Sequence, residues 1–320
     1  MKKLLTILIL FLAISLFAAM KCSQCSKKIK HNYLTSEGNI FCSEECFHAT
    51  LPTCSYCKQP CVNGYMFLGD QKFCSDKCMA KVYYCSICRK GSKHFMFMNY
   101  FDGKEWKFCA ECNKLPKCYF CSFPTKVKNV NSGKYPVCQL CEKNSVDLPE
   151  RIKIFRKIRA DLARLYRFNA QHGIEVIGVS IEKMAAMPKP DYFDNDNHAF
   201  GLMSASYWQS NSNPKKLTIK DCKIYYIESL PKPILIETLA HELTHDFLRH
   251  KVGIIDDPVD EEGFCELIAA LYNEYIGQTY LNTRKENNPN SVYGDGYRKI
   301  HAIYEQNNKD INAVLRYLKK

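Results

Sequence analysis

The residues best suited to chemistry lie in a five-residue motif, H-E-x-x-H, at positions 241 to 245. Apolar residues recur around it at helical spacing, which predicts one helix with His241 and His245 a turn apart on the same face. Two imidazoles so placed can hold one zinc ion, and Glu242 can then serve as the general base of a metallopeptidase. A surface helix that carries two histidines is the alternative. The apolar residues are Ile236, Leu239, Ala240, Leu243 and Phe247.

A second helix is expected soon after the first, because Asp257 and Pro258 are residue types preferred at a helix N-cap and first helical position. An antiparallel return would bring a carboxylate to the histidines as a third metal ligand. Glu262 is preferred for this role, since Glu266 follows one turn later and can hydrogen-bond a ligating imidazole. Glu261 stays open as the alternative, because helical periodicity places it nearer the apolar face. A solvated acidic first turn would explain both glutamates without a metal.

The first half of the chain is dominated by cysteine pairs. Seventeen of the 19 cysteines lie between residues 22 and 141, in a unit that repeats about every thirty residues. Each unit has two close pairs joined by 16 to 20 residues, a spacing that can surround one zinc ion with four sulfurs. The pattern predicts four treble-clef or LIM-like fingers. Their candidate ligands are Cys22, Cys25, Cys42, Cys46, Cys54, Cys57, Cys74, Cys78, Cys85, Cys88, Cys109, Cys112, Cys118, Cys121, Cys138 and Cys141.

A disulfide framework is the competing interpretation of these cysteines, because an exported protein meets oxidising conditions. Close pairs with two intervening residues favour zinc. Ser43 and Ser75 are each expected to cap a short helix that carries the last cysteine of its unit. Cys61 is unpaired, and is interpreted as a small buried residue, with an extra ligand or a redox-sensitive thiol as the alternative. Cys222 and Cys265 are interpreted as buried small residues and not as nucleophiles.

The N-terminus has the pattern of a secretory signal peptide over residues 1 to 20. Lys2 and Lys3 precede a long apolar run, and small residues follow at Ala18 and Ala19. The predicted location is therefore secreted or periplasmic. A membrane anchor is the alternative if this segment stays uncleaved, and only then is a membrane partner expected.

The formal net charge of +12 raises the question of a nucleic-acid partner. Residues 22 to 146 contain 18 Lys and Arg against 9 Asp and Glu. Four zinc ions, each held by four thiolates, would offset nearly all of this excess. No nucleic-acid partner is therefore expected.

The composition becomes that of an ordinary globular domain after the last cysteine pair. The predicted organisation is a signal peptide (1–20), four LIM-like fingers (21–146) and an α+β metallopeptidase domain (147–320). In the last part we expect an amphipathic helix from 149 to about 170, strands at 174–181 and 217–227, and a loop at 184–197. Ile154, Ile158, Leu162, Leu165 and Phe168 should face inward from that helix.

Residues 239–245 and 260–265 together resemble the catalytic core of the DA-one-like peptidases, and residues 201–204 and 294–298 are also similar to that family. Its members include plant ubiquitin-activated regulators of organ size, in which a LIM region precedes a gluzincin peptidase domain. The resemblance implies His241, His245 and Glu262 as zinc ligands and Glu242 as general base. This chain differs by its signal-like N-terminus and by lacking recognisable ubiquitin-interacting helices.

The sequence thus predicts an exported zinc endopeptidase with one catalytic and up to four structural zinc ions. The fingers would bind a protein substrate or a protein partner. Tyr297 and His301, one turn apart in the expected C-terminal helix, are the candidates for stabilising the oxyanion, and aromatic packing is the alternative role of Tyr297. The rival hypothesis is a non-enzymatic zinc scaffold whose second half is a degenerate relative of a peptidase.

Overall fold

The computed structural model describes residues 20–68, 70–92, 94–126, 134–169, 172–190, 199–209 and 217–319. The expected signal peptide therefore lies outside the described residues, apart from Met20. The chain forms two compact units, Met1–Phe95 and Met96–Lys320. Across the part of the chain that is described, no helix has the length and apolar character needed to cross a membrane.

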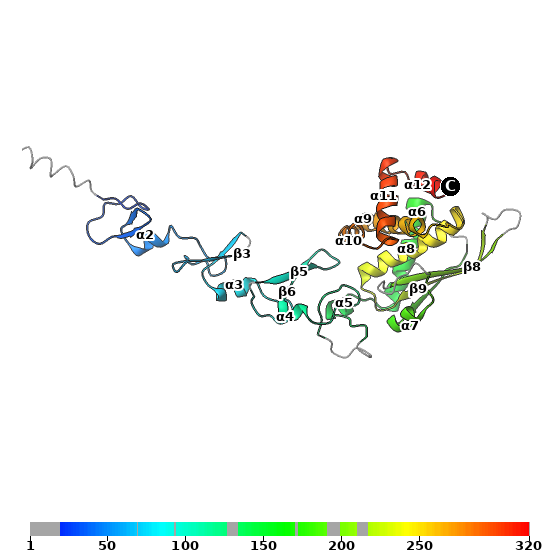
Figure 1. Cartoon of the computed structure of the whole chain (residues 1–320), viewed down its shortest axis with the longest axis horizontal. Coiled ribbons are helices and arrows are strands. Elements are labelled where there is room, and N and C mark those ends of the chain that lie inside the picture. Colours follow the sequence, from blue (N-terminus) through cyan, green and yellow to red (C-terminus); the bar gives the residue numbers. More distant parts are fainter. Residues whose placement is uncertain are drawn as a thin grey trace, which may run out of the picture. The chain divides into compact units, whose positions relative to one another are not determined.

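The first unit contains small fingers built from a cysteine turn, a two-stranded antiparallel hairpin and a short helix (Figure 1). Ser43 and Ser75 accept hydrogen bonds from the backbone N–H groups of Cys46 and Cys78, which confirms the two predicted helix caps. Cys61 is buried in the small core of the second finger. The elements are β1 (Leu34–Ser36), β2 (Asn39–Phe41), α2 (Glu44–His48), β3 (Met66–Leu68), β4 (Gln71–Phe73) and α3 (Asp76–Val82).

The second unit includes the fourth finger, whose side chains share a core with the third hairpin. The Phe123 ring lies 5.8 Å from the Tyr100 ring and 5.1 Å from the Phe108 ring. Just after this finger, Ser145 forms an antiparallel β-bridge with Pro231 of the larger domain. The compact unit therefore begins before residue 147, the expected domain boundary. Its first elements are β5 (Phe95–Asn99), β6 (Glu105–Cys109), α4 (Ala110–Asn113) and α5 (Gln139–Lys143).

The larger domain is a mixed α and β structure with a three-stranded sheet in the order β7-β9-β8. Strand β9 pairs in parallel with β7 and antiparallel with β8, so β8 lies at the sheet edge. The sequence does not predict β8, because this segment contains no β-branched residue. The three strands are β7 (Glu175–Val179), β8 (Gly201–Gln209) and β9 (Leu217–Ile227).

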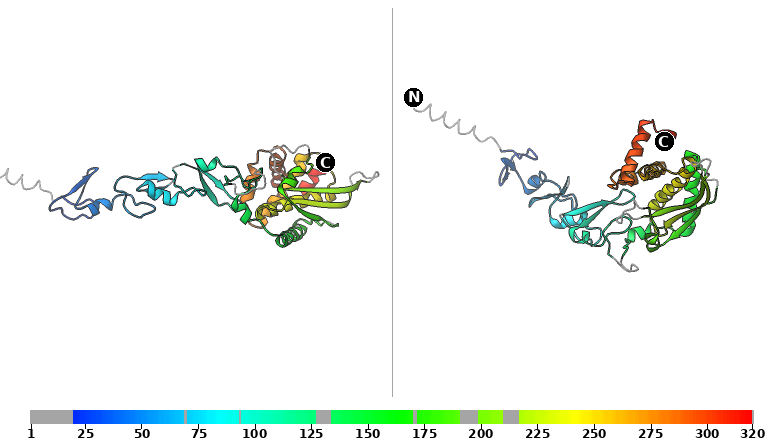
Figure 2. Two further views of the ribbon diagram at one scale, coloured as in Figure 1. Left: turned by 90° about the horizontal axis from the view of Figure 1, so that it is seen from below. Right: turned by 45° about the vertical axis from the view of Figure 1, so that its right-hand side comes forward.

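Helices surround this sheet, and one of them forms the centre of the domain. Helix α8 lies between the sheet and helices α9 and α11 (Figures 1 and 2). All its residues from Thr238 to Leu248 are buried, so it is a core helix and not a surface helix. The helices are α6 (Leu148–Tyr166), α7 (Ile181–Ala186), α8 (Lys232–Lys251), α9 (Pro258–Tyr275), α10 (Tyr280–Glu286), α11 (Tyr293–Gln306) and α12 (Ile311–Leu318).

The helix boundaries agree with the sequence in most places. Helix α9 begins with the predicted Asp257 cap and Pro258. Ile154, Ile158 and Leu162 are buried along α6, as predicted. That helix ends earlier than expected, so the buried Phe168 follows it, and Leu165 is only partly buried. The segment predicted as a loop from residue 184 begins instead inside α7, because the Ser180 side chain caps that helix.

Two glycines allow α9 and α11 to approach closely. A Cβ atom on Gly263 would lie 2.4 Å from the backbone oxygen of Gly296, far inside a normal contact. Since α9 carries Glu262 and Glu266 toward α8, the spacing of these helices sets the position of both carboxylates.

We expect Gly263→Ala to lower the free energy of unfolding by about 1–3 kcal/mol, because the added methyl group overpacks the interface between α9 and α11. Gly173→Ala is the control, since a Cβ atom there meets no atom within 4 Å. Thermal unfolding of both variants measures the difference. Equal melting temperatures for the two variants would contradict this account of the interface.

Candidate metal centre

Four groups of four cysteine sulfurs come together, one group in each finger. Within every group the sulfurs lie within 4.8 Å of one another, and every cysteine is free. The Cys25–Cys42 sulfur separation is 3.6 Å, and the Cys57–Cys74 separation is 3.7 Å. Four sulfurs at about 2.3 Å from one zinc ion are about 3.8 Å apart, whereas bonded sulfurs are about 2 Å apart. The four groups therefore fit zinc binding.

A fifth group of donors lies between α8 and α9. The Nε2 atoms of His241 and His245 are 3.2 Å apart. The Oε2 atom of Glu262 lies 3.0 Å from the first of them and 3.5 Å from the second. Ligands at about 2.0–2.1 Å from a tetrahedral zinc ion are about 3.4 Å apart. The three atoms therefore have the chemistry and separations of a His-His-Glu zinc site.

The other nitrogen of each imidazole contacts a second carboxylate of α9. The Nδ1 atom of His241 lies 3.1 Å from Glu266 Oε1. The Nδ1 atom of His245 lies 2.8 Å from Glu261 Oε1. A carboxylate at Nδ1 holds the proton there and leaves Nε2 free to bind a metal. Glu261 and Glu262 thus occupy different places: Glu262 faces the Nε2 pair, and Glu261 orients His245.

Two cations hold these outer carboxylates in position. The Nη2 atom of Arg249 lies 2.7 Å from Glu261 Oε1. The ammonium group of Lys285, which is buried, pairs with both Glu266 and Glu237. Sequence reasoning missed both cations. Arg249 follows His245 by four residues, so helical spacing could have indicated it, whereas Lys285 comes from a separate helix and has no local signal.

Burial and charge together set the protonation of the group. Burial alone would lower the pKa of His241, but Glu262 and Glu266 raise that pKa well above its ordinary value. Burial opposes ionisation of Glu266, yet Lys285 and His241 bring the pKa of Glu266 to about 2. Burial raises the pKa of Glu242 above its usual value.

The charge balance of the group also fits a divalent cation. Five carboxylates, three of them buried and two half-buried, face two permanent cations, so neutral imidazoles and ionised carboxylates would leave three negative charges at the site. Buried charge of one sign is costly unless it is compensated, and a dication supplies that compensation. The carboxylates are Glu237, Glu242, Glu261, Glu262 and Glu266, and the cations are Arg249 and Lys285.

Cys265 is a further donor at the same place. Its sulfur lies within 4.8 Å of donor nitrogens of His241 and His245, so a His-His-Cys set also fits zinc. The residue is fully buried, and burial raises the pKa of its thiol. From the sequence, Cys265 is expected only to be a small buried residue. Its spacing of three from Glu262 on one helix could have placed it on the same face.

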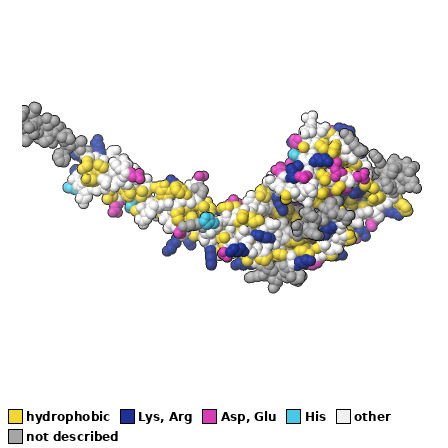
Figure 3. All heavy atoms as spheres, viewed as in Figure 1, with side chains coloured by type: hydrophobic (Ala, Val, Ile, Leu, Met, Phe, Trp, Pro, Cys, Tyr) yellow, Lys and Arg dark blue, Asp and Glu magenta, His cyan; other side chains and the backbone are white. Residues whose placement is uncertain are grey.

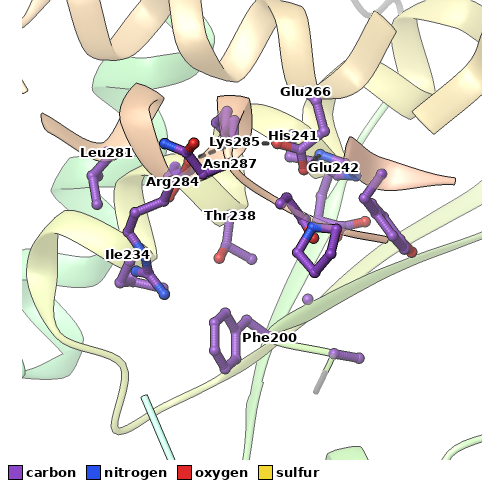
Figure 4. Close-up of a pocket in the computed structure, with 16 residues that line it drawn as sticks. Phe200, Ile234, Thr238, His241, Glu242, Glu266, Leu281, Arg284, Lys285 and Asn287 are labelled. Atoms are coloured by element: carbon purple, nitrogen blue, oxygen red, sulfur yellow. Dashed lines mark hydrogen bonds and ion pairs between the residues drawn. The ribbon is translucent and has the colours of Figure 1, made fainter. Parts of the chain in front are cut away.

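A pocket of about 560 Å³ opens beside His241 and Glu242 (Figure 4). Strand β8 reaches it through Gly201, where a Cβ atom would lie 2.7 Å from Glu242 Oε1. Among the described residues, Tyr297 and His301 are outside the pocket lining. Tyr293, one turn before Tyr297, lines the pocket instead, and its ring centroid lies 6.3 Å from that of His241.

The fourth finger supports one wall of this pocket. Phe200 lines the pocket, and its ring centroid lies 5.9 Å from that of Phe120 and 6.1 Å from that of Tyr119. Both of these aromatic residues stand between Cys118 and Cys121, in the turn that carries two of the finger's sulfurs. The turn that carries two cysteines of this finger therefore packs against a side chain of the pocket.

No family model matches this chain, and a comparison with curated proteins finds no match.

We expect the purified chain to contain about five zinc ions, one for each cysteine group and one for the histidine site. Elemental analysis against protein concentration measures this ratio. His241→Ala should lower it by about one, because the histidine site loses a ligand. A ratio near one in the unaltered chain would contradict the assignment of the cysteine groups.

Glu266→Gln should weaken zinc binding at the histidine site by about 10- to 100-fold, because His241 loses the carboxylate that orients it. Competition with a chelator of known affinity measures the change. Glu182→Gln, on the exposed side of α7, is the matched control and should leave the affinity unaltered. An unchanged affinity in Glu266→Gln would remove the supporting role of this residue.

Proposed function

We propose that the chain is a zinc-dependent endopeptidase of the gluzincin type, related to the DA-one-like peptidases that its motifs resemble. The proposal rests on the arrangement of three donor atoms. Three donor atoms, from His241, His245 and Glu262, lie 3.0–3.5 Å apart beside Glu242, at the edge of a pocket large enough for peptide side chains.

Each residue has a distinct role in the proposed reaction. His241, His245 and Glu262 would hold the zinc ion, which supplies Lewis acidity for polarising a peptide carbonyl and acidifying water. Glu242 accepts a proton from the attacking water and passes it to the leaving amine. Burial raises the pKa of Glu242 above its usual value, which favours uptake of a proton by this carboxylate.

Tyr293 is the candidate donor to the oxyanion that forms when water attacks the carbonyl. We prefer it to Tyr297 and His301, because it lines the pocket near His241 whereas those two contact each other at a ring separation of 5.3 Å. Tyr297 is buried, and burial raises the pKa of its hydroxyl to about 12.

We further propose that the fingers of the first unit bind a protein. Tyr65 and Phe67 lie beside each other on the second hairpin with ring centroids 5.0 Å apart, and Phe67 is 66% exposed. Figure 3 shows hydrophobic side chains at the finger surface, with Lys and Arg spread among them and not gathered in one patch on this face. Exposed aromatic side chains are enriched at protein-binding surfaces, and this pair supports a protein partner. We also propose that the protein is exported, because residues 1–20 have the sequence pattern of a secretory signal peptide.

Glu242→Gln tests the mechanism. The variant should keep its zinc, because Glu242 is not a proposed ligand, and should lose peptide hydrolysis by at least about 10²-fold through loss of the general base. Cleavage of a fluorogenic peptide mixture and elemental analysis measure the two properties. Hydrolysis at the unaltered rate with zinc retained would refute the proposed role of Glu242.

A further inference from the structure

Helix α10 places one guanidinium group at the pocket. Arg284 is exposed and lines the pocket together with Leu281 and Lys285 of the same helix. In Figure 4 its side chain extends toward Ile234, whereas His241 and Glu242 stand on the other side of the view. A positive group is therefore present in the pocket, away from the proposed catalytic base.

The two permanent cations of the pocket differ in their surroundings. Lys285 is buried and is neutralised by Glu237 and Glu266. Arg284 has no carboxylate within ion-pair distance among the residues that the structure describes. Its charge is thus available at the pocket surface, and guanidinium groups bind carboxylates through paired hydrogen bonds.

An aromatic ring of the third hairpin holds this guanidinium group. The Arg284 Cζ atom lies 4.9 Å from the centre of the Phe101 ring, which is itself buried. The hairpin touches α10 at a second point, since a Cβ atom on Gly103 would meet the Tyr280 ring at 3.5 Å. A planar cation that stacks on a fixed ring loses less freedom when it binds an anion.

We propose that Arg284 recognises a carboxylate of the peptide substrate and makes the pocket selective for acidic sequences. This inference rests on the proposed peptidase function and names its substrate class. The carboxylate comes from an aspartate or glutamate side chain or from the end of the substrate chain. Its binding at Arg284 keeps that negative charge away from Glu242, and so fixes which peptide bond lies beside the general base.

The experiment uses the full chain with its zinc and a set of quenched fluorescent peptides of one neutral sequence. A single glutamate is moved through each position, and every peptide has a partner with glutamine at that position. A second arm compares free and amidated C-termini. We expect kcat/KM to be about fivefold higher for glutamate than for glutamine at one position, the upper range for a solvent-accessible Arg–carboxylate pair. The same ratio for free over amidated ends would identify the chain terminus as the source.

Variants of Arg284 then assign the preference to this residue. Arg284→Gln should bring the acid-to-amide ratio to about one, and Arg284→Lys should keep part of it, since the charge stays but the paired geometry is lost. Arg284→Glu should reverse the preference toward a lysine peptide. Phe101→Leu should lower the ratio, because the guanidinium group loses the ring on which it stacks.

Arg316→Gln and Arg316→Glu are the controls, because they make the same changes of charge on an exposed residue of α12. Both should keep the ratio of the unaltered protein. Cleavage with equal kcat/KM for all acidic and amide peptides would overturn the inference and leave the peptidase proposal standing. A lack of cleavage of every peptide would instead refute the peptidase proposal itself.

Discussion

Two imidazoles from α8 stand buried between carboxylates from α9, and the second unit is built around that contact. Charges in such a place are stable only when their partners are held in good geometry. Arg249 and Lys285 supply that geometry by fixing Glu261 and Glu266, which in turn fix the two rings. The Nε2 atoms then converge with Glu262 at separations that fit the ligands of a zinc ion.

Other features of the domain keep these two helices in place. Glycines at the interface of α9 and α11 allow close packing, and Gly201 allows β8 to approach Glu242. The same edge strand leads back to Phe200, where two aromatic residues of the fourth finger contact the pocket wall. The fourth finger is therefore part of the pocket's support, in addition to any docking role. Phe200 thus lines the same pocket as His241 and contacts the turn that carries two cysteines of this finger.

The local parts of this arrangement could be predicted from the sequence. The H-E-x-x-H helix, the Asp257 cap of the next helix and the serine caps of two fingers depend on neighbouring residues, and the structure contains each of them. The different places of Glu261 and Glu262 could not be derived from neighbouring residues. The two side chains point about 100° apart, and on a helix that is buried on most sides the sequence does not say which direction faces the histidines. The packing of α9 against α8 determines which of them faces the Nε2 atoms.

The features that depend on tertiary packing have no local signal in the sequence. Lys285 and Arg284 come from a short helix that the sequence does not connect with the motif, and β8 contains no Val, Ile or Thr and has strand-favouring aromatic residues only at Tyr207 and Trp208. Tyr293 and Tyr297 are the same residue type, one helical turn apart. Only the packing of the helix determines that Tyr293 is the one that reaches the pocket. Cys265 shares a helix face with Glu262, yet its closeness to both imidazoles depends on how α8 and α9 meet.

The central claim is that one zinc ion is held by His241, His245 and Glu262. Anomalous X-ray diffraction from crystals of the full chain, recorded on both sides of the zinc absorption edge, tests it most directly. We predict an edge-dependent peak bonded to both Nε2 atoms and to Glu262 Oε2, with ligand distances of about 2.0–2.2 Å. A site without such a peak in zinc-loaded crystals, or a peak bonded to Cys265 in place of Glu262, would contradict the account.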